Sequence, residues 1–98
     1  MSEFKVFVLP DAEAEIAAAF SWYIERNPQA AEAFRAEVLE IVDSLSDAPT
    51  KWKLGEDGAR RRVLRHFPYT VFFDVEGEAV FVLAVAHQRR APGYWRSR

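Results

Sequence analysis

The residues best suited to binding or catalysis follow one another near the end of the chain. Residues 87–95 read HQRRAPGYW and hold an imidazole, two guanidiniums, a phenol and an indole. His87 could move a proton near neutral pH, while Arg89 and Arg90 could bind phosphate or carboxylate groups. The preceding run Val80–Ala86 is typical of a strand buried on both faces, which is a rigid support for a site. The segment therefore predicts a binding or catalytic site at the end of this strand.

Structural alternatives stay open for the same segment. Tyr94 and Trp95 could pack back onto the core, and His87 could be a hydrogen-bonded histidine at the edge of that core. If the segment stays extended, His87 and Arg89 point to one side and Arg90 to the other, because side chains alternate along a strand. In that case the two arginines cannot bind one phosphate together.

The two halves of the chain differ in charge. Residues 1–59 hold five Lys/Arg and twelve Asp/Glu, whereas residues 60–98 hold eight Arg, no Lys and three Asp/Glu. Because Arg forms planar, bidentate contacts with carboxylate or phosphate, the second half predicts an acidic partner, either nucleic acid or protein. The alternative is that charge is merely segregated between helices and strands, which then attract one another.

Four arginines of the basic half fall in a single short strand. Arg61, Arg62 and Arg65 are candidates for contact with a partner, and Arg60 precedes them. The alternative is an exposed edge strand that charge keeps soluble. His66 is expected to have no functional role.

The composition excludes several classes of protein. A chain of 98 residues, half of them hydrophobic, predicts one domain over residues 1–98 with a single core. The absence of cysteine excludes disulfides and thiolate metal sites, and two histidines predict no dedicated metal site and no cofactor. The longest apolar run, residues 79–86, is too short to cross a bilayer, and no secretory signal is evident. We therefore expect a cytoplasmic protein with no membrane partner.

Hydrophobic spacing predicts a strand followed by two helices in the first half. Residues 4–9 are mostly β-branched and aromatic, as in a strand. Apolar residues at helical spacing mark a helix over residues 11–26. Asn27-Pro28 then supplies a typical N-cap and first helical residue for a second helix, which ends before Pro49. Because the joint is so short, we expect an antiparallel helical hairpin.

The second half is expected to contain three strands. A loop over residues 46–59 leads to strands at 61–66, 69–75 and 78–87, the last two joined by a turn at Glu76-Gly77. The predicted fold is α+β: a strand, a helical hairpin and a three-stranded antiparallel meander in one sheet with both helices on one face. The other face must be covered by the loop, the tail or a partner.

Four large side chains are expected to be structural. Trp22 and Tyr23 should pack against the second helix rather than bind a ligand. Trp52 and Leu54 should fix the loop to the core.

Four local motifs follow one another along the chain: the strand, proline and acidic helix start at Leu9–Ile16, the helix joint at Trp22–Ala31, the hairpin at Tyr69–Gly77 and the closing segment at Val85–Trp95. Together with the order of the elements, these motifs resemble the RelE/ParE superfamily of toxins from type II toxin–antitoxin operons. Within the superfamily the chain is most similar to the ParE-like, plasmid-stabilisation branch. That resemblance implies a toxin that inhibits DNA gyrase and is neutralised by a cognate antitoxin.

A second function is implied by the RelE branch, whose members cleave mRNA in the ribosome. Such cleavage needs a base, an acid and cationic support for the phosphate. Two positions that carry catalytic arginine in RelE-type enzymes fall on Thr70 and Gln88, so His87, Tyr94 and Arg65 would have to do the work. A third alternative is a degenerate member that only binds its antitoxin.

The antitoxin of such a toxin uses an acidic, otherwise disordered segment that folds on the toxin. The resemblance therefore implies that the basic half is at least partly an antitoxin interface. The candidate residues for contact with target or antitoxin are Arg61, Arg62, Arg65, His87, Arg89, Arg90, Tyr94 and Trp95.

Overall fold

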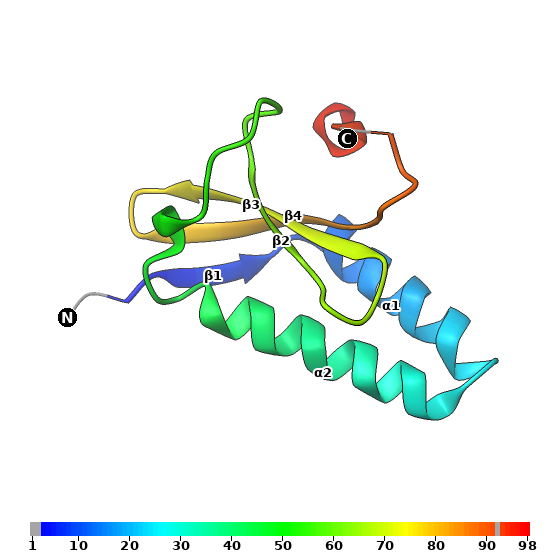
Figure 1. Ribbon diagram of the computed structural model, residues 1–98. Coiled ribbons are helices and arrows are strands. Elements are labelled where there is room, and N and C mark those ends of the chain that lie inside the picture. The colour runs from blue at the N-terminus through cyan, green and yellow to red at the C-terminus, as the bar shows by residue number, and fades with distance from the viewer. Residues whose placement is uncertain (1–2, 92) are drawn as a thin grey trace.

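The computed structural model describes residues 3–91 and 93–98, which form a sheet with a pair of helices on one side of it (Figure 1). The α+β class and the order of strand, helical hairpin and three strands are confirmed. The elements are β1 (Lys5–Val8), α1 (Pro10–Ile24), α2 (Pro28–Ser44), the 3-10 turn η1 (Pro49–Lys51), β2 (Arg60–Val63), β3 (Tyr69–Glu76), β4 (Ala79–His87) and the 3-10 turn η2 (Tyr94–Ser97).

The sheet has the strand order β1-β4-β3-β2. Strands β2, β3 and β4 form the expected antiparallel meander, and β1 pairs in parallel with β4. The parallel pairing needs a long connection, which the helical hairpin provides by carrying the chain beneath the sheet. Between Phe72 and Phe73 of β3 the pairing skips Leu83 of β4, so Leu83 is the extra residue of a β-bulge.

The helical joint forms as its sequence predicts. The Asn27 side-chain oxygen accepts hydrogen bonds from the backbone nitrogens of Gln29 (3.1 Å) and Ala30 (3.2 Å), and Pro28 is the first residue of α2. This cap satisfies two amides that have no partner within the helix. The joint is therefore held by local contacts alone.

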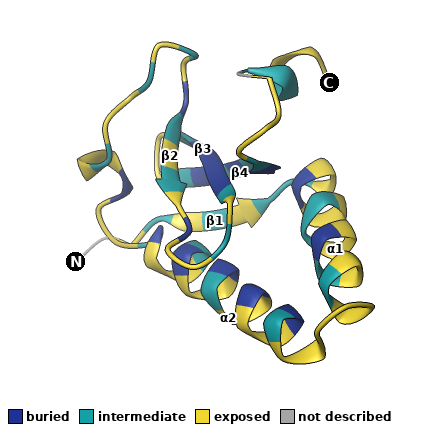
Figure 2. Ribbon diagram, turned by 45° about the vertical axis from the view of Figure 1, so that its right-hand side comes forward, coloured by how far each residue is buried: buried dark blue, intermediate teal, exposed yellow. Residues whose placement is uncertain are grey.

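The main core lies between the helices and the sheet (Figure 2). Buried residues of α2, notably Phe34 and Val38, meet Phe73 and Val82 of the two central strands. On the opposite face a smaller cluster is covered by the tail, because Tyr94 and Trp95 pack there. The packing of these two aromatic residues onto the core, which the sequence left as an alternative, is what the structure shows. The smaller cluster consists of Phe72, Ala84 and Ala86.

Two predicted boundaries were wrong. Strand β2 ends at Val63 rather than at residue 66, because the Glu37 carboxylate of α2 accepts hydrogen bonds from the backbone nitrogens of Arg65 and His66. Those two amides are thereby drawn out of the strand ladder. The hairpin turn is one residue later than expected, since Glu76 still pairs with Ala79 across it.

Two of the four large side chains that were expected to be structural are not. Trp52 packs against the core, but Leu54 is 53% exposed at the loop surface. Tyr23 packs against Phe34 of α2, with ring centres 5.6 Å apart, whereas Trp22 is 52% exposed.

None of the helices described by the structure combines the length and apolar character needed to cross a membrane.

Candidate functional site

The segment after β4 turns back instead of continuing as a strand. The backbone nitrogen of Gln88 donates to the Pro68 carbonyl (2.8 Å), and that of Arg90 donates to the His87 carbonyl (3.0 Å). The Arg89 nitrogen donates to His87 Nδ1 at 3.1 Å, so in the neutral imidazole the proton sits on Nε2. The strict alternation expected of an extended tail therefore does not apply here.

Glu15 of α1 holds the tail against the sheet. Its carboxylate accepts the backbone N–H of Val85 (2.9 Å), the hydroxyl of Tyr94 and both terminal nitrogens of Arg98 (3.0 Å each). Arg98 also donates to the carbonyl of the bulged Leu83 at 2.8 Å. Burial raises the pKa of Glu15, but the hydrogen bonds from Arg98, Tyr94 and Val85 outweigh burial, and its pKa is lowered overall. We call these five residues the tail anchor.

The anchor fixes the chemical state of Tyr94. Burial, then the hydrogen bond to Glu15, raises the pKa of its hydroxyl to about 12. The guanidinium carbon of Arg90 lies 3.9 Å from the centre of the Tyr94 ring. Tyr94 is thus a neutral hydrogen-bond donor whose ring supports a cation, and its hydroxyl is already engaged.

A small cavity of about 160 Å³, the tail pocket, lies between the tail and the sheet. It gathers Arg61 of β2 with three of the tail residues singled out from sequence, His87, Arg90 and Tyr94. Arg61 lies 4.8 Å above the Phe72 ring and forms an ion pair with Asp57 at 2.6 Å. The lining residues are Arg61, Thr70, Phe72, Ala86, His87, Gln88, Arg90, Ala91 and Tyr94.

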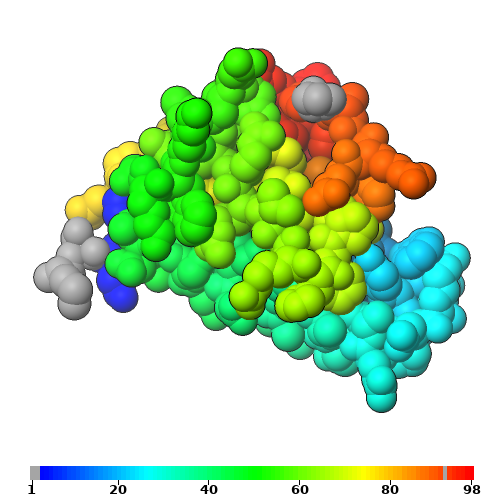
Figure 3. Space-filling model, in the orientation of Figure 1, coloured from blue at the N-terminus to red at the C-terminus, as the bar shows by residue number. Residues whose placement is uncertain are grey.

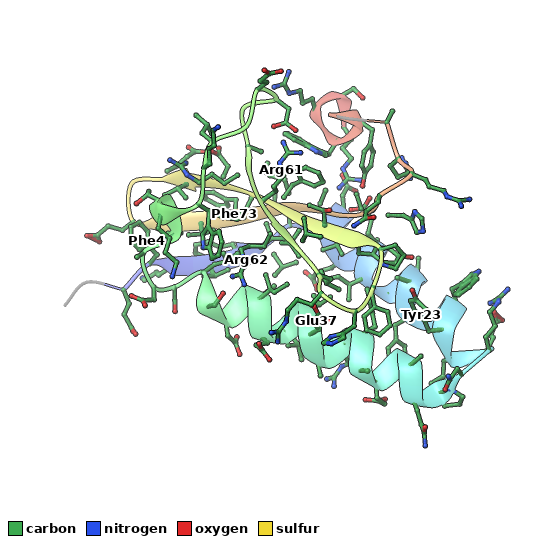
Figure 4. The ribbon with its side chains drawn as sticks, viewed as in Figure 1. Phe4, Tyr23, Glu37, Arg61, Arg62 and Phe73 are labelled. Carbon is green, nitrogen blue, oxygen red and sulfur yellow. The ribbon has the colours of Figure 1, made fainter. Side chains whose placement is uncertain are left out.

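Other basic candidates lie outside this pocket. Figure 4 shows Arg61 and Arg62 on opposite sides of the sheet, as their neighbouring positions in β2 require. Arg62 donates to the Ser44 hydroxyl (2.9 Å) and stacks 4.1 Å above the Trp52 ring on the helical side. Arg65 is exposed beside Glu37, whose carboxylate holds its backbone. The arginines of residues 60–65 therefore do not form one cluster.

The remaining tail candidates also lie outside the lining of the tail pocket. Arg89 is exposed at the turn. Trp95 packs over Phe72, with ring centres 5.7 Å apart, and serves as cover for the sheet.

A larger cavity, the aromatic cleft, was missed by sequence reasoning. It measures about 490 Å³ and opens between α1, the start of β3 and the tail. In Figure 3 the orange segment after β4 stands over the blue part of α1 on this side of the molecule. The signal that could have found it was the adjacent pair Trp22-Tyr23, of which one member cannot face the core. The lining residues are Glu15, Ala18, Ala19, Trp22, Tyr23, Pro68, Tyr69, Val85, Ala86, His87, Arg90 and Tyr94.

A third depression, the helical groove, runs between α1 and α2 and measures about 430 Å³. Its lining is mostly apolar and includes the exposed Leu39, with one acid, Glu13, and one base, Arg35, among its residues. Among the described residues no three His, Cys, Asp or Glu side chains gather as a metal site would require.

A family model described as the ParE toxin of the type II toxin–antitoxin system, parDE, matches residues 6–92. The chain belongs to the ParE toxin family. Among solved structures it is similar to a chain from the chromosomal ParDE toxin–antitoxin system of P. aeruginosa, with a TM-score of 0.77 and 20% identity over 86% of this chain and 95% of that chain. At that identity the similarity concerns the fold. A search of curated proteins found no match.

In this member of the ParE family, the tail pocket departs from the RelE pattern at the positions that the resemblance singled out. Thr70 and Gln88, which the resemblance aligns with two catalytic arginines of RelE-type enzymes, both line the pocket. Neither side chain carries the positive charge that a pentavalent phosphate needs. Arg90 gives the pocket a guanidinium that can bind an anion, whereas Arg61 is already paired with Asp57.

Proposed function

We propose that the chain, as a single toxin domain over residues 1–98, inhibits DNA gyrase by binding it and performs no chemical step. We further propose that it acts in the cytoplasm and that a cognate antitoxin from the same operon neutralises it. Membership of the ParE family supports the antitoxin partner, and the gyrase target is what the resemblance to the ParE branch implies. The observation that carries the proposal is the tail pocket, which has cations for binding but no complete set of groups for catalysis.

The state of Tyr94 argues against catalysis at this pocket. A tyrosine that serves as a base must lose its proton, and one whose pKa is about 12 rarely does so at neutral pH. Its hydroxyl also points to Glu15, away from any substrate in the pocket. His87 would remain as the one imidazole among the described residues that line the pocket.

The exposed arginines of the tail suit the binding of another protein. Arg90 and Arg89 are exposed on the turn, and the anchor through Glu15 and Arg98 holds that turn in place without a partner. A preformed cationic surface loses little conformational entropy when it binds an acidic surface of another protein.

Two assays with purified protein test the proposal: supercoiling of relaxed plasmid by DNA gyrase and cleavage of mRNA on translating ribosomes. We expect inhibition of supercoiling and no cleavage. Arg90→Gln should weaken the inhibition about tenfold, as expected when a contact of a charged pair at the centre of an interface is removed. Arg62→Gln is the matched control, because Arg62 lies on the helical side. Equal effects of the two substitutions, or no inhibition by the wild type, would contradict the proposal.

The RNase alternative rests on His87, which lies in one pocket with Arg61 and Arg90. If the ribosome assay shows cleavage that His87→Ala abolishes, the chain is an mRNA endonuclease. Its cationic groups would then be arginines at positions other than Thr70 and Gln88. A protein that is inert in both assays and harmless in cells would instead be a degenerate member that only binds its antitoxin.

A further inference from the structure

The aromatic cleft has the form of a pocket for one large apolar side chain. Its walls are the rings of Trp22, Tyr23, Tyr69 and Tyr94, and small residues of α1, including Ala18, leave the space open between them. Figure 4 labels Tyr23, which comes from α1 on this side of the molecule. Aromatic walls around a cavity of this size are typical of sites that hold an apolar anchor.

Two cations lie beside these walls, and one of them, Arg26, also pairs with the exposed Glu25 at 3.6 Å. The Arg26 guanidinium lies 4.0 Å from the centre of the Trp22 ring, and that of Arg90 lies 3.9 Å from the Tyr94 ring. The one carboxylate among the lining residues, Glu15, is neutralised by its two contacts with Arg98. The cleft therefore combines an apolar interior with a positive rim, although the neighbouring helices are acidic.

We propose that the aromatic cleft binds a large apolar side chain of an acidic peptide, supplied by the antitoxin. This inference rests on the proposed function for the existence of an antitoxin and adds the surface and the chemistry that it recognises. The helical groove gives no comparable preference for an acidic peptide, because its lining holds one acid, Glu13, and one base, Arg35. Carboxylates that flank the apolar anchor would instead pair with Arg26 and Arg90 at the cleft.

The position of the cleft explains how such a peptide would neutralise the toxin. Arg90, Tyr94, His87 and Ala86 line the aromatic cleft and the tail pocket alike. A carboxylate that binds Arg90 from the cleft withdraws that guanidinium from the target. The antitoxin thus blocks the tail pocket through the residues that the two cavities share, without having to fill the tail pocket itself.

Two neighbouring alanines of α1 allow a sharp test. Ala18 lines the aromatic cleft and Ala17 lines the helical groove, and both are exposed. Ala18→Trp fills the cleft, whereas Ala17→Trp places the same side chain one residue away on the other side of the helix. The probe is the purified antitoxin encoded beside the toxin gene, and its Kd for each variant is measured by titration calorimetry. Thermal unfolding monitored by circular dichroism verifies that both variants fold.

We expect Ala18→Trp to weaken antitoxin binding about 30-fold or more, as loss of an anchor contact does, and Ala17→Trp to change it less than about threefold. Cells that express Ala18→Trp should stop growing even when the antitoxin is present, because the tail pocket stays intact. The inference is overturned if Ala18→Trp binds as tightly as the wild type, or if both variants lose affinity equally. Failure of the wild type to bind the antitoxin, or to inhibit gyrase, would instead refute the proposed function.

Discussion

Replacing Glu15 by alanine tests how the tail is held over the sheet. The carboxylate is the common acceptor for a strand amide, a phenol and a guanidinium that come from residues 85–98. Glu15→Ala leaves all three donors without this acceptor, and two of them, from Val85 and Tyr94, lie in partly buried surroundings. We therefore expect the substitution to lower the free energy of unfolding and to release the tail.

The expected loss of unfolding free energy follows from how exposed each of the three donors is to water. The Val85 amide and the Tyr94 hydroxyl lie in partly buried surroundings, and a donor stranded there costs about 1 kcal/mol at the lower end of the usual range. The Arg98 side chain is 27% exposed and can turn to water, so its loss amounts to about 1 kcal/mol. Together these give about 3 kcal/mol for Glu15→Ala, against about 1 kcal/mol for Arg98→Ala.

Urea unfolding followed by tryptophan fluorescence measures both changes, since Trp95 belongs to the tail and packs over Phe72 of the sheet. Glu13→Ala is the matched control, because Glu13 is exposed on the same helix, and it should cost less than about 0.5 kcal/mol. The double variant Glu15→Ala/Arg98→Ala should lose less stability than the two single losses added together, because Glu15→Ala already removes the pair with Arg98, which keeps only its contacts with the Leu83 carbonyl and Asp11. A cost below about 1 kcal/mol for Glu15→Ala, or strict additivity of the two substitutions, would refute the anchor.

Three further outcomes are expected. The pKa values of Glu15 and Glu37 are lowered from 4.5 in the folded chain, so their contribution to stability is present above pH 4.5 and is lost as the pH falls below it. When the free energy of unfolding is measured against falling pH, Glu37→Gln should lose less stability below pH 4.5 than the wild type. The pKa of Tyr94 is raised from 10.0 to about 12, so stability should be complete below pH 10 and decline towards pH 12, and Tyr94→Phe should remove that phase from an ultraviolet titration. Gly55→Ala places a Cβ 2.6 Å from the Arg61 guanidinium and 3.1 Å from the Ala59 carbonyl, whereas at Gly77 nothing lies within 4 Å. Gly55→Ala should therefore shift the backbone amide signals around Arg61 and Asp57 in nuclear magnetic resonance spectra. Gly77→Ala, which strains its own hairpin turn because Gly77 has a φ of +59°, should leave the signals around Arg61 and Asp57 unchanged.

Much of the fold could be predicted because its signals are local. The Asn27-Pro28 joint specifies a helix end and a helix start within a few residues. The hydrogen bond that the Gln29 backbone nitrogen donates to the Asn27 side chain lies inside that stretch. Apolar residues at helical and strand spacing identified the elements in the same way. The end of β2 could not be predicted, since the Arg65 amide is captured by Glu37, 28 residues away along the chain.

The candidate site was only partly accessible to sequence reasoning. His87, Arg90 and Tyr94 were identified from residue type, and they do line one pocket. Because side chains alternate along a strand, the sequence predicts that Arg61 and Arg62 lie on opposite faces of the sheet. Which of the two lies beside the tail depends on which face the helices cover, and this is visible only in the structure. The aromatic cleft has walls from α1, β3 and the tail, so no single stretch of sequence contains it.

The sequence by itself determined the succession of elements, the basic second half and the membership of the toxin family, because these depend on residue order and local conformational preference. The tertiary structure alone decided that the tail turns back, that Glu15 holds it, and that two cavities share a wall. The physical reason is that each of these features is a contact between residues far apart in the chain. Such contacts form only where the packing of the helices on the sheet brings their donors and acceptors within reach.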